Sequence, residues 1–197
     1  MKTLLLILLL VPMIGFGQTA EEYHNRGNEY MELEKYYEAI AEYSKAIKLN
    51  PDDADAYYNR GIAYANLENY KDAIVDYSSA IKIDTDYAYA YNNRGIAYDK
   101  LKNYKDAIVD YSMAIRINPD DAYAYNNRGC AYANLENYKD AIADFSSAIK
   151  INPDDAYAYK NRGIAKKNSG LPYCSDYKKA CDLGEEKCCE WYYKQCR

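Results

Sequence analysis

The sequence predicts an all-α protein, a solenoid of stacked antiparallel helix pairs that ends in a cysteine-rich helical cap. Two observations carry this prediction. A glycine preceded by Asn-Arg recurs every 34 residues, and a fixed period of this size is typical of stacked arrays. Between the glycines, apolar and small residues fall at the three-and-four spacing of helical faces. The recurring glycines are Gly27, Gly61, Gly95, Gly129 and Gly163.

The first segment, residues 1–17, has the three-part form of a secretory signal peptide. An unbroken apolar run, 4–11, is too short for a membrane anchor and is followed by Pro12. We expect cleavage after Gly17, which leaves Gln18 first and no cysteine nearby for a lipid anchor. The mature chain is therefore expected to be exported, periplasmic or secreted, and not held in a membrane.

The charge balance disfavours nucleic acid as a partner. The chain has 197 residues, with 30 acidic against 25 basic side chains and a net charge of −5. This balance provides no attraction to a phosphate backbone. Tyrosine is abundant, at 26 residues, and the apolar residues are periodic, which rules out a disordered or low-complexity chain.

Each unit is predicted to contain two helices. In the second unit, Tyr57, Gly61 and Tyr64 share one helical face, and apolar residues within 70–81 share another. The segment 66–69 between them supplies the turn. Asn-Pro pairs stop the second helix of other units, because a residue before proline is pushed out of helical geometry. The closing prolines are Pro51, Pro119 and Pro153, with Thr85 at the equivalent position of the second unit.

These features together resemble the tetratricopeptide repeat family: the 34-residue period, the glycine, two alanines, the aromatics and the terminal proline. The resemblance covers residues 20–155 as four full units and implies a right-handed α-solenoid. It also implies that one face of each first helix lines a concave groove, where an extended segment or helix of a partner docks. The expected organisation is units at 20–53, 54–87, 88–121 and 122–155, a degenerate fifth unit at 156–183 and a cysteine-rich cap at 184–197.

An arginine precedes each recurring glycine, where the family usually has leucine. A lone charge on a packed face is costly, so these arginines need partners. A matching series of acids stands before the aromatic of each second helix, and we expect a structural Arg–acid bridge within or between units. The arginines are Arg26, Arg60, Arg94, Arg128 and Arg162. The acids are Glu42, Asp76, Asp110, Asp144 and Asp176.

Five of the six cysteines lie in the C-terminal tail, which in an exported chain favours disulfides. If 174–183 and 186–196 form an antiparallel hairpin that turns at Gly184, residues equidistant from the turn face each other. Cys181 then meets Cys189, and Cys174 meets Cys196, which leaves Cys130 and Cys188 unpaired. This connectivity is a preference, and the rival is a four-thiolate zinc site, which lacks the short C-x-x-C hooks.

The second face of each first helix combines tyrosines, asparagines and isoleucines, which suit recognition of another protein. The alternative is that its isoleucines only pack against the neighbouring first helix. His24, Asn28 and Asn59 faintly resemble a family arrangement that grips a C-terminal carboxylate, but Tyr89 and Asn93 replace the expected basic residues, so no such receptor is predicted. The candidate groove residues are Tyr58, Ile62, Tyr89, Asn92, Asn93, Ile96, Lys100, Tyr123, Asn126, Asn127, Cys130, Asn134, Tyr157, Lys160 and Ile164.

No convergent set of catalytic groups is visible in the sequence. The one histidine, His24, repeats nowhere, and no phosphate loop, nucleophile elbow or metal-binding histidine pair is present. Cys130 replaces a groove isoleucine and is interpreted as a small apolar residue rather than a reactive thiol. The sequence therefore predicts a non-enzymatic adaptor or scaffold, without cofactor or metal, that binds a protein or peptide. The alternative is a self-assembling structural component of the cell envelope.

Overall fold

The computed structural model describes residues 18–196, so the expected signal peptide lies outside the described residues. Within that range the chain is all-helical, which confirms the predicted fold class. The helices are α1 (Ala20–Glu32), α2 (Tyr36–Leu49), α3 (Ala54–Asn66), α4 (Tyr70–Ile83), α5 (Ala88–Lys100), α6 (Tyr104–Ile117), α7 (Ala122–Asn134), α8 (Tyr138–Ile151), α9 (Ala156–Asn168), α10 (Cys174–Asp182) and α11 (Glu186–Gln195).

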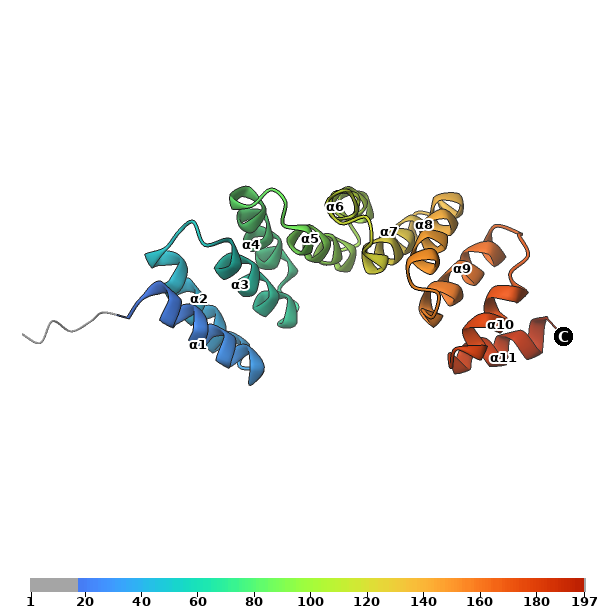
Figure 1. Cartoon of the computed structure of the whole chain (residues 1–197), viewed down its shortest axis with the longest axis horizontal. Helices are drawn as coiled ribbons and strands as arrows, with labels where there is room; N and C mark the ends of the chain where they lie inside the picture. The colour runs from blue at the N-terminus through green and yellow to red at the C-terminus, as the bar shows by residue number, and fades with distance from the viewer. Residues whose placement is uncertain (1–17, 197) are drawn as a thin grey trace, which may run out of the picture.

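Successive helices pair in chain order, and the pairs follow one another along an elongated arch (Figure 1). Each odd-numbered helix from α1 to α9 packs on the helix that follows it, and α1, α3, α5 and α7 each also contact the next odd-numbered helix. The odd-numbered helices thus form a continuous row along one face of the array. None of the described helices is long and apolar enough to cross a membrane.

The turn inside each of the first four units follows one backbone pattern. In the second unit the amide of Glu68 donates to the carbonyl of Ala65, and the amide of Asn69 donates to that of Tyr64. These two bonds define a Schellman motif, whose central residue takes a left-handed conformation. Glycine is the usual residue there, but this chain uses longer polar ones. The φ angles are 56° at Glu34, 58° at Glu68, 61° at Lys102 and 59° at Glu136.

Between units, an aspartate starts the next helix. The side chain of Asp53 accepts a hydrogen bond from the amide of Ala56, and Asp121 and Asp155 accept equivalent bonds at α7 and α9. A side-chain acceptor at this position satisfies amides that have no partner within the helix. The paired acids between units therefore have a structural role as helix caps.

The core repeats around a contact between glycine and a buried ring. A Cβ atom built on Gly95 would lie 2.7 Å from Cε1 of Tyr111, which is 2% exposed. The other units contain the same contact, with Phe145 replacing tyrosine in the fourth. Real Cβ atoms do not approach a ring so closely, so only glycine lets the two helices of a unit pack at this distance.

The arginines before these glycines are bound within their own units, which confirms the expected Arg–acid bridges. Nε and Nη2 of Arg94 donate to the two carboxylate oxygens of Asp110, each at 2.7 Å. Nη1 of Arg94 donates to Ser78 of the preceding unit at 2.9 Å, so this arginine also joins two units. The same bonds join Arg60 to Asp76 and Ser44, Arg128 to Asp144 and Ser112, and Arg162 to Asp176 and Ser146.

Helices α10 and α11 close the C-terminal end as a hairpin. Disulfides join Cys174 to Cys196 and Cys181 to Cys189, the pairs that the antiparallel register predicts. Cys188 keeps a thiol and is fully buried beside Tyr177 in the apolar cluster of the cap. A terminal unit lacks a neighbour to cover its apolar face, and this hairpin supplies the cover for α9.

Candidate partner-binding groove

We use "the groove" for the face of the row α3, α5, α7 and α9 that carries the predicted residues. Its most exposed large side chains are three tyrosines at equivalent positions in successive units. Tyr89 is 66% exposed, Tyr123 is 77% exposed and Tyr157 is 60% exposed. Because tyrosine offers rigid apolar area with a polar tip, a row of this kind is typical of protein recognition surfaces.

Two matching pockets open on the groove, 68 residues apart in the sequence. The first has a volume of about 280 Å³, between α3 and α5, and is bounded by Ile62, Tyr77, Ile96 and Lys100. The second has a volume of about 350 Å³, between α7 and α9. Its lining includes the equivalent residues Cys130, Phe145, Ile164 and Asn168.

The groove isoleucines both pack and line these pockets. Ile62 lies against the cluster of Ala73, Tyr77 and Ala97, and Ile164 lies against the cap cluster. Each remains partly exposed and forms part of a pocket wall. These side chains therefore pack within the array, and they also leave apolar surface in the pocket walls.

A ladder of hydrogen bonds runs across the groove from unit to unit. In each of α5, α7 and α9, Nδ2 of one asparagine donates to a side chain on the first helix of the preceding unit, 35 positions earlier in the sequence. The bonds are Asn93 to the Tyr58 hydroxyl at 3.0 Å, Asn127 to Asn92 Oδ1 at 3.2 Å and Asn161 to Asn126 Oδ1 at 3.3 Å. These amides are therefore partly occupied within the chain, and they fix the relative position of neighbouring first helices.

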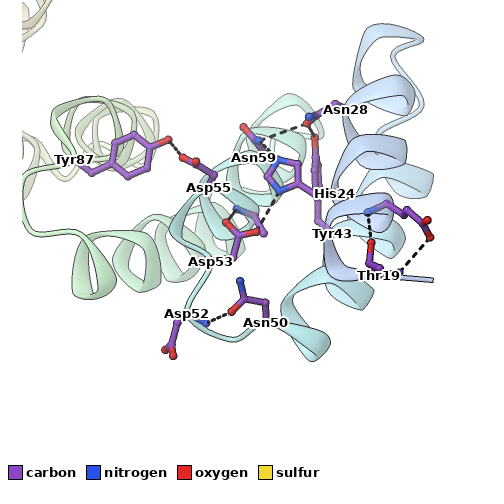
Figure 2. Close-up of polar contacts among 12 residues, drawn as sticks. Thr19, His24, Asn28, Tyr43, Asn50, Asp52, Asp53, Asp55, Asn59 and Tyr87 are labelled. Atoms are coloured by element: carbon purple, nitrogen blue, oxygen red, sulfur yellow. Dashed lines mark hydrogen bonds and ion pairs between the residues drawn. The ribbon is translucent and has the colours of Figure 1, made fainter. Parts of the chain in front are cut away.

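The ladder continues at its N-terminal end through His24 (Figure 2). Nδ2 of Asn59 lies 3.1 Å from His24 Nε2, and Nδ1 of His24 lies 3.3 Å from Asp53 Oδ2. Because an amide nitrogen only donates, Nε2 is assigned as the acceptor and Nδ1 as the donor to Asp53. Asn28 accepts from the Tyr43 hydroxyl at 2.7 Å. The three residues that resemble a carboxylate grip are thus bonded among themselves and to neighbours.

Two predicted groove residues have strong contacts within the chain. Tyr58 is half-buried, and its ring lies 4.8 Å from that of Tyr87, between ring centroids. Lys160 pairs with Glu185 of the cap at 3.2 Å, and its Nζ lies 4.2 Å from the ring centroid of Tyr157. A partner would have to compete with these contacts at Tyr58 and Lys160.

Cys130 lies in the wall of the second pocket and accepts a hydrogen bond from Asn161 at 3.5 Å. Burial, and then the charge of Asp99, raises the pKa of the Cys130 thiol to about 11. The thiolate is the reactive form, so little of it exists at neutral pH. Among the described residues, no group of three His, Cys, Asp or Glu side chains is placed to hold a metal ion.

The helix pairs of this chain match the models of one repeat family. The tetratricopeptide repeat model matches residues 54–87, 88–121 and 122–155, and a further TPR repeat model matches residues 27–68. The chain belongs to the tetratricopeptide repeat family. No curated protein matches the sequence.

Solved structures with the same fold include MamA and two proteins described with a peptide-binding site or a bound peptide. A crystal structure of the MamA protein is 27% identical, with a TM-score of 0.79, and the match covers 85% of this chain and 93% of that one. YrrB, described as a TPR protein with an unusual peptide-binding site, is 25% identical, with a TM-score of 0.77 and coverage of 89% and 92%. The first TPR domain of Spaghetti (RPAP3), bound to an HSP90 peptide, is 30% identical, with a TM-score of 0.59 and coverage of 60% and 94%.

Proposed function

We propose that this chain is an exported, non-enzymatic adaptor that holds a segment of a partner protein in the groove. The observation that carries the proposal is the row of three exposed tyrosines on α5, α7 and α9, helices that also line the two pockets. Large exposed apolar side chains gathered beside pockets mark interaction sites. The peptide-binding sites of YrrB and RPAP3 support the same use of this fold.

The export part of the proposal is supported by the cap. Two disulfides staple α10 to α11, and such bonds form and persist in oxidising compartments outside the cytosol. The signal-peptide form of residues 1–17 agrees with that location. The partner is therefore expected to be another exported protein, in the periplasm or outside the cell.

A cross-linked pull-down from the native host tests the proposal. Mature chain 18–197 should capture a specific exported protein, and replacing Tyr89, Tyr123 and Tyr157 by alanine should remove that capture without unfolding the chain. A matched control replaces Tyr37, Val75 and Val109, which are 75%, 62% and 60% exposed on even-numbered helices, and should capture normally.

Two results would contradict the adaptor. Full retention of the partner by the tyrosine variant would remove the groove as its site. Capture of only the chain itself by both forms would favour the self-assembling structural component. Size measurements at several protein concentrations separate that case, because end-to-end stacking grows with concentration.

A further inference from the structure

One pocket-lining position of the groove changes from a small apolar residue to an acidic one between neighbouring units. Ala65 lines the first pocket and Ala133 lines the second, at equivalent positions of α3 and α7. The equivalent residue of α5, between the two pockets, is Asp99. An acidic side chain therefore replaces a small apolar one at the centre of the groove, where its position faces the same way as the pocket-lining alanines.

The Asp99 carboxylate lacks full compensation within the described residues. Its Oδ1 atom is buried and has no hydrogen-bond partner there, although the side chain as a whole is half-buried. Burial raises the pKa of Asp99, while the exposed Lys100 and a hydrogen bond from Asn134 favour the charged form. Native structures rarely leave a buried polar atom unsatisfied, and such an atom calls for an explanation.

Apart from the exposed Lys100, the described neighbours of Asp99 supply no counter-charge. Its charge contributes to the raised pKa values of the Tyr111 hydroxyl and the Cys130 thiol, so both groups lie within its electrostatic reach. Both are neutral near pH 7, and neither is ionically paired with it. Lys100 is directed toward the first pocket, whose wall it helps to form. The carboxylate thus lies half-buried at the centre of the groove, without a guanidinium partner of the kind that holds Asp110.

From these contacts we propose that the groove binds an extended segment whose lysine or arginine pairs with Asp99 while apolar side chains enter the two flanking pockets. A cation that approaches the partly exposed Asp99 from the groove supplies a counter-charge, which a neutral donor would not. This inference rests on the proposed function and specifies the chemistry of its partner.

The fold also sets the spacing of such a segment. Neighbouring packed helices lie roughly 10 Å apart, so one first-helix step separates each pocket from Asp99 by about that distance. An extended chain rises about 3.3 Å per residue. The apolar residues should therefore flank the basic one at about three residues on each side.

Selection from a phage-displayed library of random linear peptides tests the inference. Peptides selected on the mature chain should be enriched in lysine or arginine at one position, with apolar residues on both sides. Asp99→Ala should remove the basic preference and keep the apolar one. We expect Asp99→Ala to fold normally, because the chain itself has alanine at the equivalent positions 65 and 133.

A fluorescence-polarisation assay with one selected peptide then measures the pair. Replacing its basic residue by glutamine should weaken binding about 10- to 100-fold for the unmodified chain, the usual range for a charge-assisted hydrogen bond. The same replacement should matter much less for Asp99→Ala. The reciprocal variant, Asp99→Ala with Ala65→Asp, should move the preferred basic residue from the centre of the peptide to the position that lies at the first pocket.

The outcomes distinguish this inference from the proposed function. Selected peptides without basic enrichment, or an equal basic preference in Asp99→Ala, would overturn the role of Asp99. If those peptides still lost binding in the tyrosine variant, the groove adaptor would stand. Failure to select any groove-binding peptide would contradict both.

Discussion

Replacing Arg94 by alanine should lower the free energy of unfolding by about 3 kcal/mol, because it breaks a buried ion pair. The side chain of Asp110 is 4% exposed and receives two of its hydrogen bonds from Arg94. Without Arg94, the Asp110 carboxylate would stay buried but would lose its counter-charge. Burial raises the pKa of Asp110, and the bonds and charge of Arg94 oppose that shift. Ser78 of the preceding unit would also lose its bond. Thermal melting followed by circular dichroism should show a midpoint lower by about 6–12 °C.

Two variants control this measurement. Arg116, an exposed arginine in the last turn of α6, should tolerate alanine with a change of less than about 0.5 kcal/mol. The double variant Arg94→Ala with Asp110→Ala should be less destabilised than the sum of the two single variants, because no charge is left buried. An unchanged melting curve for Arg94→Ala would show that the pair does not hold the array together.

Removing the Cys174–Cys196 disulfide should destabilise the cap by about 3 kcal/mol, the value expected for a closed loop of this size. The cap is one short hairpin with a small apolar cluster, so its stability depends strongly on its two disulfides. In Cys174→Ser with Cys196→Ser, hydrogen exchange should speed up in α10 and α11. Because repeats are stabilised mainly by their neighbours, exchange in α3 to α6 should change little.

Alkylation with mass detection controls the assignment of the cysteines. In unfolded, non-reduced protein, two cysteines should react, Cys130 and Cys188, and all six should react after reduction. In the native state both thiols should react slowly, because burial raises the pKa of each. More than two alkylations before reduction, or unchanged exchange in the cap of the serine variant, would contradict the stapled hairpin.

Much of the fold was predictable because each unit repeats the same local physics. The glycine and the aromatic of a unit recur together, and their contact in the core follows from helical spacing. The Arg–acid bridges were predictable because a charge on a packed face needs a partner. Whether they lay within or between units depended on side-chain reach. The serine bonds to the preceding unit were missed, although Ser44, Ser78, Ser112 and Ser146 recur at the same 34-residue period.

The groove was harder to predict, because its residues serve the array and the surface together. The pattern placed Tyr58 with the other groove tyrosines, but it could not show that Tyr87 would cover its ring. The pairing of Lys160 with the cap depends on a hairpin that does not follow the repeat. The signal at Asp99 was present in the sequence as an aspartate between the alanines at the equivalent positions of the two neighbouring units, Ala65 and Ala133. Only the structure shows that its oxygen is buried and unsatisfied.

The central claim is that a partner lies in the groove formed by the odd-numbered helices. Site-specific photo-cross-linking tests it most directly, with a photoreactive phenylalanine analogue placed at Tyr123 or, as the control, at Tyr37. Both side chains are highly exposed, at 77% and 75%, but Tyr37 lies on α2 outside the groove. We expect a covalent adduct with the captured protein from position 123 and none from position 37. Equal adducts from both positions, or an adduct from position 37 alone, would contradict it.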